Sequence, residues 1–256
     1  MNQETKEYLL KKGIEQKNFP DTVYKYRTIK QMEMILDNFS FWFANPNSFN
    51  DPFDCNLSEI NPPNLDDAKK HLQTLNIKEN DLIKALDCYE QNPTELTQLV
   101  ETIKEKTIFS KGVLSLSEKY DDILMWSHYS DYHKGVVIGL SMDDDIPFFV
   151  TPIKIDYKNE YEILNYLSNP HKSIIDTLKI KSSHWQYENE IRIYKDKIGL
   201  QQINKKAIVK IYFGIKTSNE DIDKIKTICK SKNLTHIKFY KGHQSYGSFE
   251  IKFELI

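Results

Sequence analysis

The stretch ILMWSHYSDYHKGVVIGL, residues 123–140, joins a polar, aromatic cluster directly to an apolar segment. A tryptophan, two histidines and a carboxylate fall within residues 126–133, and no polar side chain follows Lys134 in the quoted stretch. Such an apolar run predicts a buried strand. Polar side chains at the entrance of a strand indicate either a turn packed on the core or the wall of a ligand pocket, since binding residues concentrate on loops beside rigid elements.

Strand and helix patterns alternate along the rest of the chain. Residues 23–29 have a strand pattern, residues 30–38 a helical one, and residues 39–54 an aromatic strand that ends in a loop rich in Pro, Asn and Asp. Further patterns predict strands at 111–120, 134–142, 148–158 and 206–214, a strand at the end of 183–195, helices within 159–180 and at 218–233, and two strands after residue 234. We therefore expect one α+β domain over residues 1–256, with a mainly antiparallel sheet, flanking helices and a helical insertion at about 62–108.

Charge is unevenly distributed along the chain. The net charge of the 256 residues is −2, but residues 1–150 carry 16 Lys and Arg against 25 Asp and Glu, whereas residues 151–256 carry 19 against 12. The halves therefore have net charges of −9 and +7. A basic half is compatible with a nucleic-acid or phosphate partner, and equally with charge pairing between the two halves.

Cysteine usage and hydropathy predict a cytoplasmic location. Cys55, Cys88 and Cys229 are odd in number and far apart, with neither zinc-site spacing nor a disulfide framework. A reducing compartment suits such a chain. The N-terminal segment MNQETKEYLLKKG lacks an apolar signal core, and no run approaches the ~18 apolar residues of a membrane span. We expect a soluble cytoplasmic protein without membrane contact.

Four clusters carry most of the candidate chemistry, and each lies at the end of a predicted strand or in an adjoining loop. Two of them contain Arg27 and Arg192, the only arginines in a lysine-rich chain. These two are candidates for bidentate contacts to an anion, or for packing roles. The clusters are Tyr24, Lys25, Tyr26 and Arg27; Asn50, Asp51, Pro52, Phe53 and Asp54; Ser115, Ser117, Trp126, His128, Tyr129 and His133; and Trp185, Tyr187, Glu188, Glu190 and Arg192.

Glu188 and Glu190 have two interpretations. If both lie on one strand, they share a face, and burial together would raise the pKa of at least one. Such a pair suits acid–base work, a metal ion or a ribose hydroxyl. If Glu188 still belongs to the preceding turn, only Glu190 and Arg192 share a face, and they form an ion pair.

The remaining patterns argue against several enzyme classes. The spacing of His128 and His133 matches no standard metal motif. No nucleophile elbow surrounds Ser115 or Ser117, and no Gly-rich phosphate loop occurs. Asn50-Asp51-Pro52 is typical of a turn, and the simplest role for the three tryptophans is core packing.

Taken together, YKYR (24–27), FWFANPNSFNDPFD (41–54), LSLSEKYDDILMWSHYSDYHKGVVIG (114–139) and WQYENEIRIY (185–194) resemble the bacterial domain of unknown function family 2971. The resemblance runs from about residue 23 to about residue 250. Four separated motifs in the expected order make it specific, but this family leaves the function open.

A second resemblance concerns the order of elements, which is similar to that of ADP-ribosyltransferases, including the DNA-modifying toxin branch. It implies a split sheet, with the basic first-strand residue at Arg27 or Lys25, the aromatic strand at residues 41–43 and the catalytic glutamate at Glu190. Ser115 and Ser117 stand only loosely for the middle motif, and no complete catalytic set can be assigned.

This resemblance implies that NAD is a substrate, that nucleic acid or protein is the acceptor, and that the setting is a toxin or phage-defence effector with an antitoxin or defence-system partner. A carboxylate would stabilise the charge that develops at the ribose. The residues expected at the site are Glu190, His128 and Arg27 for catalysis, Tyr26, Lys25, Ser115, Ser117, Trp126, Tyr129 and Arg192 for NAD, and Asn50, Asp51, His133 and Glu188 for the second substrate.

Two alternatives remain open. In the first, the four clusters form the recognition pocket of a non-enzymatic binding module. In the second, Asp51, Asp54, His128 and Glu190 hold metal ions in a nuclease.

Overall fold

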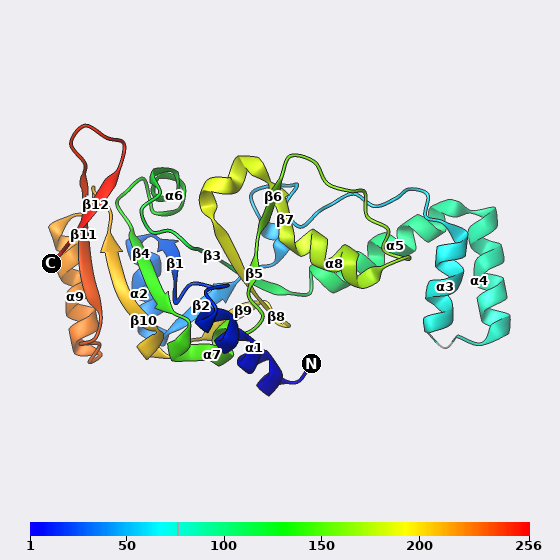
Figure 1. The fold of residues 1–256 in the computed structure, drawn as a ribbon, viewed down its shortest axis with the longest axis horizontal. Helices are drawn as coiled ribbons and strands as arrows, with labels where there is room; N and C mark the ends of the chain where they lie inside the picture. The colour runs from blue at the N-terminus through cyan, green and yellow to red at the C-terminus, as the bar shows by residue number, and fades with distance from the viewer. Residues whose placement is uncertain (76) are drawn as a thin grey trace.

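The computed structural model describes residues 1–75 and 77–256, and its centre is an eight-stranded sheet with the order β12-β11-β10-β4-β1-β3-β8-β5 (Figure 1). Its neighbouring strands are antiparallel except for β10 and β11, which are parallel. The predicted α+β class with a mainly antiparallel sheet is confirmed. The strands are β1 (Thr22–Arg27), β3 (Gly112–Ser117), β4 (Val136–Ser141), β5 (Ile153–Lys154), β8 (Glu190–Lys195), β10 (Ile208–Phe213), β11 (Lys238–Gln244) and β12 (Ile251–Leu255).

Helices flank the sheet, and α3 and α4 lie at the end of the molecule farthest from β12 (Figure 1). No helix within 1–75 or 77–256 is both long and apolar enough to cross a membrane. The α-helices are α1 (Gln3–Glu15), α2 (Ile29–Asn38), α3 (Leu65–Thr74), α4 (Glu79–Gln91), α5 (Pro93–Ile108), α6 (Ile123–Tyr129), α7 (Ile146–Phe149), α8 (Pro170–Lys179) and α9 (Asn219–Ser231). Short 3-10 turns are η1 (Pro46–Ser48), η2 (Asp143–Asp145), η3 (Ser183–Glu188) and η4 (Lys205–Ala207).

The apolar core occupies both faces of the sheet. In β4, Val136 and Ile138 pack into the larger cluster, while Val137 packs into an aromatic cluster. All three side chains are fully buried, which confirms the buried strand expected from the run of apolar residues. A capping box at Thr28 begins α2, whose predicted apolar face packs into the larger cluster.

The sheet splits between β1 and β3. β1 pairs with β4 along its whole length, but with β3 only at Tyr24 and Ser117. Beyond that point, another strand approaches β3, since β2 (Ser40–Phe43) is followed by Ala44, which bridges Val113. β2 itself pairs with β9 (Gly199–Gln202) in a separate two-stranded sheet. Residues of both strands line a cavity where the split opens.

Several local predictions differ from the structure. The strand expected at 148–158 is the short helix α7 followed by β5 and β6 (Asp156–Lys158), because Asp145 caps the helix and Pro147 occupies its first turn. β6 pairs with β7 (Ile180–Ser182). The sequence patterns did not predict α1 or β9. Helices α3, α4 and α5 fall within the expected insertion. That residues 1–256 form a single domain stays a prediction.

Candidate functional site

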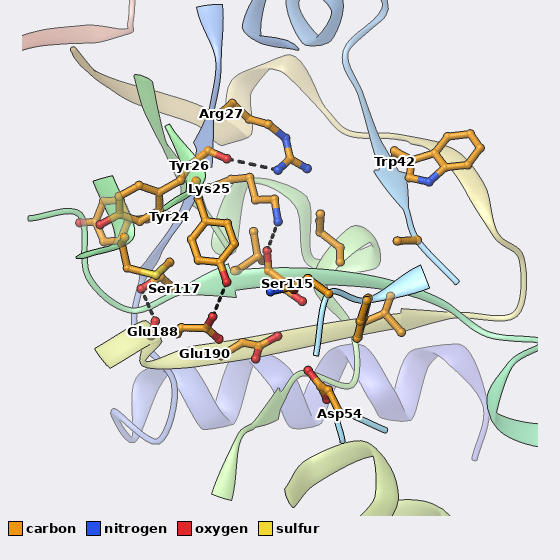
Figure 2. A pocket seen from close by; sticks show the side chains of 18 of the residues that line it. Tyr24, Lys25, Tyr26, Arg27, Trp42, Asp54, Ser115, Ser117, Glu188 and Glu190 are labelled. Carbon is orange, nitrogen blue, oxygen red and sulfur yellow. Dashed lines mark hydrogen bonds between the residues drawn. The ribbon is translucent and has the colours of Figure 1, made fainter. Parts of the chain in front are cut away.

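A cavity of about 270 Å³ opens where β1 and β3 diverge (Figure 2). Four segments that are separate in the sequence meet around it: β1, β2 with the loop that follows it, β3 with α6, and the region from β7 to β8. The side chains that line the cavity include those of Tyr24, Lys25, Tyr26, Arg27, Trp42, Phe49, Asn50, Asp54, Ser115, Ser117, Met125, Tyr129, Lys181, Glu188 and Glu190.

Two cations from β1 form one wall. Lys25 donates from Nζ to the carbonyl oxygen of Ser115, and Arg27 donates from Nη1 to the carbonyl oxygen of Tyr26 at 3.2 Å. Burial lowers the pKa of Arg27 to about 10. Burial, together with the nearby Arg27, holds the pKa of Lys25 well below its usual range. In the described part of the chain, neither side chain forms an ion pair with a carboxylate, so an anion in the cavity would find both cations available.

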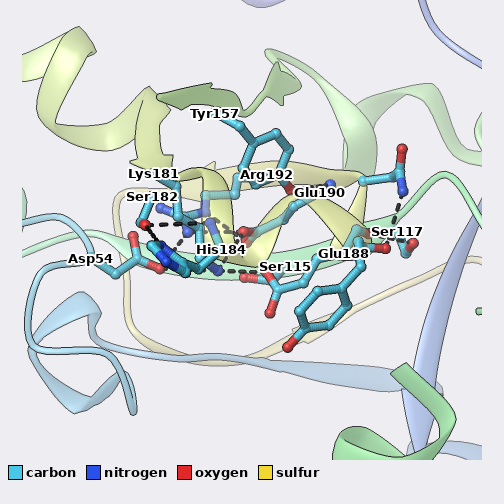
Figure 3. Close-up of polar contacts among 12 residues, drawn as sticks. Asp54, Ser115, Ser117, Tyr157, Lys181, Ser182, His184, Glu188, Glu190 and Arg192 are labelled. Carbon is cyan, nitrogen blue, oxygen red and sulfur yellow. Dashed lines mark hydrogen bonds and ion pairs between the residues drawn. The ribbon is translucent and has the colours of Figure 1, made fainter. Parts of the chain in front are cut away.

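A buried ionic network forms the opposite wall (Figure 3). Nζ of Lys181 lies 2.5 Å from Oε2 of Glu188 and 3.1 Å from Oε2 of Glu190. It also lies 3.4 Å from Oδ2 of Asp54. Arg192 contacts Asp54 at 2.6 Å through Nη2 and Glu190 at 2.7 Å through Nε. Because the five side chains are almost fully buried, their positions depend on one another.

The two walls carry opposite excess charge. When all groups are ionised, three carboxylates against two cations leave one excess negative charge in the buried network. The β1 wall adds the cations Lys25 and Arg27. The cavity therefore suits a ligand with a negative group at one end and a positive or electron-poor group at the other.

The pKa values of the two glutamates of this network are shifted in opposite directions. Burial raises the pKa of Glu188 above its usual range, although Lys181 opposes the rise. Burial would also raise the pKa of Glu190, but Arg192 and Lys181 outweigh burial and hold it well below its usual range. Neighbouring carboxyl groups with separated pKa values are typical of acid–base sites. Of the two, Glu190 holds its negative charge more firmly and Glu188 accepts a proton more readily.

Local backbone geometry explains how both carboxylates reach Lys181. Glu188 ends η3, Asn189 has a left-handed φ of 42°, and Glu190 begins β8. Of the two interpretations drawn from the sequence, the structure fits the second: Glu188 belongs to the turn, while Glu190 and Arg192 share a face and form an ion pair. The turn nevertheless brings Glu188 to the same lysine.

Other predicted residues line the cavity through the contacts that fix them. Tyr129 donates its hydroxyl to Oε1 of Glu188 at 2.6 Å. Ser117 donates to the carbonyl oxygen of Glu188 at 2.6 Å and is fully buried. Tyr26 donates to the carbonyl oxygen of Lys119 at 3.1 Å. Ser115 and Asn50 also border the cavity, so nine of the predicted site residues meet around it: Lys25, Tyr26, Arg27, Asn50, Ser115, Ser117, Tyr129, Glu188 and Glu190.

The other predicted residues lie elsewhere. Trp126 is fully buried and donates from Nε1 to the carbonyl oxygen of Tyr120 at 2.7 Å. His133 stacks on Trp126, with ring centroids 6.3 Å apart. His128 is exposed, and Asp51 accepts a hydrogen bond from a backbone N–H within its own turn. Arg192 lies behind the cavity, where it holds Glu190.

The polar cluster at 126–133 is mainly a tight turn. Asp131, Tyr132 and His133 follow one another in the left-handed region, with φ of 50°, 54° and 70°. Gly214 packs so closely that an added Cβ would lie 2.1 Å from the carbonyl oxygen of His133. Such strain persists only where the surrounding structure fixes it. From the quoted stretch, Met125 and Tyr129 line the cavity.

Some cavity residues were missing from the sequence-based set. Lys181 is one of many lysines, and nothing in its neighbourhood marks it out. Asp54 belongs to one of the four clusters, but its sequence context assigns it no role other than that of a metal ligand in the nuclease alternative. Trp42 had a usable signal, because strand alternation between Phe41 and Phe43, both buried in the core, turns it to the opposite face.

The nuclease alternative requires a convergent set of metal ligands. Among residues 1–75 and 77–256, no group of three or more His, Cys, Asp or Glu side chains is arranged to hold a metal ion. Asp54 and Glu190 do approach each other, but Lys181 and Arg192 occupy the space between their oxygens. A metal ion would have to displace these cations.

Comparison with known proteins adds one match. The family described as Protein of unknown function (DUF2971) matches residues 125–193. The matched segment begins within α6, includes β4 and ends within β8, so it contains Lys181, Glu188, Glu190 and Arg192 of the buried network. No curated protein and no solved structure matches the chain. Over residues 125–193, therefore, the chain is similar to the DUF2971 family.

Proposed function

We propose that the cavity binds NAD and transfers its ADP-ribosyl group to a nucleic-acid or protein acceptor. One observation carries the proposal: three neighbouring strands supply the cations Lys25 and Arg27, the serine Ser115 and the glutamate Glu190 around a single cavity. These are the positions at which the resemblance to ADP-ribosyltransferases implies the basic, middle and glutamate residues.

The charge distribution supports a dinucleotide of this kind. NAD carries a negatively charged diphosphate and a positively charged nicotinamide ring. Lys25 and Arg27 would hold the diphosphate, since charge-assisted hydrogen bonds to phosphate are strong. The opposite wall has one excess negative charge, and it would face the nicotinamide riboside.

The reaction breaks the bond between ribose C1′ and the ring nitrogen, and the electron pair leaves with nicotinamide. Positive charge then develops at the ribose, where ionised Glu190, fixed by Arg192, stabilises it without reorganising. The acceptor forms a bond to C1′ and loses a proton. Glu188, whose pKa burial raises, takes that proton while Tyr129 and Lys181 keep its carboxylate in place.

Release of nicotinamide from NAD tests the proposal, with water, single-stranded DNA or protein extract supplied as acceptor. We expect release by the parent protein and a rate at least roughly 100-fold lower in Glu188→Gln, because general-base catalysis contributes about 10²–10⁴-fold. Glu162→Gln, at an exposed position, is the matched control. Thermal unfolding would verify that both variants fold.

Two results would contradict the proposed reaction. Equal rates for the parent and Glu188→Gln would remove Glu188 from the mechanism. Saturable NAD binding without nicotinamide release or labelled acceptor would instead support the non-enzymatic binding module.

A further inference from the structure

Trp42 is exposed at the mouth of the cavity. It lies on β2, where Phe41 and Phe43 turn into the core and pack against Phe148. Trp42 faces the other way, and 57% of its surface is exposed. Its indole and the guanidinium of Arg27 both border the cavity, away from Glu190 (Figure 2).

Exposed apolar side chains continue from the indole onto the neighbouring strand. Leu200 of β9 is the cross-strand partner of Trp42 and is 58% exposed, and Ile198, two positions before Leu200 in the sequence, is 41% exposed. A cluster of large, exposed apolar side chains at the edge of a cavity is typical of a binding surface. A flat ring placed on the indole would cover part of this surface.

We propose that Trp42 and Arg27 form a nucleotide subsite, with the base stacked on the indole and its phosphate on the guanidinium. Aromatic side chains stack on any base, and arginine matches phosphate geometry. The cavity, at about 270 Å³, is near the lower end of ligand pockets, which span roughly 300–1,000 Å³. It therefore holds only part of a dinucleotide, and a second nucleotide unit reaches the mouth.

This subsite deepens the proposed function and rests on it for the identity of the ligand. The nucleotide at Trp42 has two sources: the adenosine half of NAD, or a nucleotide of a nucleic-acid acceptor. Both bring a base and a phosphate to the same two side chains. The test therefore begins with a probe that needs no reaction.

The first experiment compares binding of AMP and ribose 5-phosphate by calorimetry. In the parent protein the base should strengthen binding by roughly ten-fold, in line with base stacking on an aromatic ring. Trp42→Tyr should keep most of that preference, and Trp42→Leu should lose it. Tyr246→Leu, which removes another fully exposed aromatic side chain, should change nothing. Equal binding of both probes by the parent, or an unchanged preference in Trp42→Leu, would overturn the subsite.

The second experiment identifies the source. If Trp42 holds the adenosine half, Trp42→Leu weakens NAD but not nicotinamide mononucleotide. If it holds an acceptor base, Trp42→Leu weakens a single-stranded oligothymidylate but not NAD. Unchanged affinity for all three probes would contradict the inference. Because these are binding measurements, the subsite can fail while nicotinamide release succeeds, and the reverse.

Discussion

Lys181 is the common partner of three buried carboxylates, so replacing it is the sharpest test of the network. In Lys181→Met, Asp54 and Glu190 would keep their ion pairs with Arg192, whereas Glu188 would lose the ion pair that it forms with Lys181. Breaking a buried ion pair costs about 3–5 kcal/mol of unfolding free energy. For a chain of this size, 1 kcal/mol shifts the melting temperature by about 2–4 °C, so we expect a fall of about 6–20 °C.

The size of this fall in melting temperature should depend on pH, in a direction set by the charges of the network. Without Lys181, the folded-state pKa values of Glu188 and Glu190 rise, because the favourable charge is gone while burial remains. A carboxyl group whose pKa is higher in the folded state binds protons on folding, so lowering the pH stabilises the variant. The loss in melting temperature should therefore be smaller at pH 5 than at pH 8.

Differential scanning calorimetry of the parent and Lys181→Met between pH 5 and pH 8 would measure both effects. Lys172→Met is the matched control, since Lys172 also contacts two carboxylates but at the surface, where such pairs add little. If the melting temperature of Lys181→Met stays within about 2 °C of that of Lys172→Met at every pH, the network does not stabilise the fold. A difference of 2 °C is about the shift expected from 1 kcal/mol.

Three further outcomes are expected. Binding of sulfate, an anion that does not itself titrate between pH 7 and pH 10, should take up protons within that range, because an anion raises the depressed pKa of Lys25; calorimetry in two buffers of different ionisation enthalpy measures the uptake, which Lys25→Met should abolish. Gly214→Ala should lower the melting temperature strongly, because its Cβ would clash with the backbone oxygen of His133; an unchanged melting temperature would disprove this close packing. A thiol reagent should label exposed Cys88 in the folded protein and Cys55 only after unfolding, since burial raises the pKa of Cys55 to about 12; equal labelling rates, read by mass spectrometry, would contradict that burial.

Periodic patterns explain which parts of the fold could be predicted. The apolar run of β4 and the spaced apolar residues of α2 depend on local sequence, and the structure contains both elements where they were expected. In α7 a local signal was overlooked, because Asp145 and Pro147 mark a helix start within an apolar segment that resembles a strand. Patterns of this kind locate elements but do not show which of them meet.

The ionic network depends on contacts that no local pattern encodes. Arg192 meets Asp54 across 138 positions of sequence, and Lys181 joins both to the turn at Glu188. Glu188, Glu190 and Arg192 could be singled out because charged residues alternate at the start of a strand pattern. Lys181 could not, because its role arises only when β7 approaches β8.

If the cavity is an NAD site, the cations of the β1 wall determine its affinity for NAD. Calorimetric titration should show saturable binding by the parent and by the surface control Lys30→Gln. Arg27→Gln should bind at least roughly ten-fold more weakly, because a hydrogen bond to a charged group contributes about 1.5–3 kcal/mol. Absence of saturable binding by the parent, or equal affinity for Arg27→Gln and Lys30→Gln, would contradict the account.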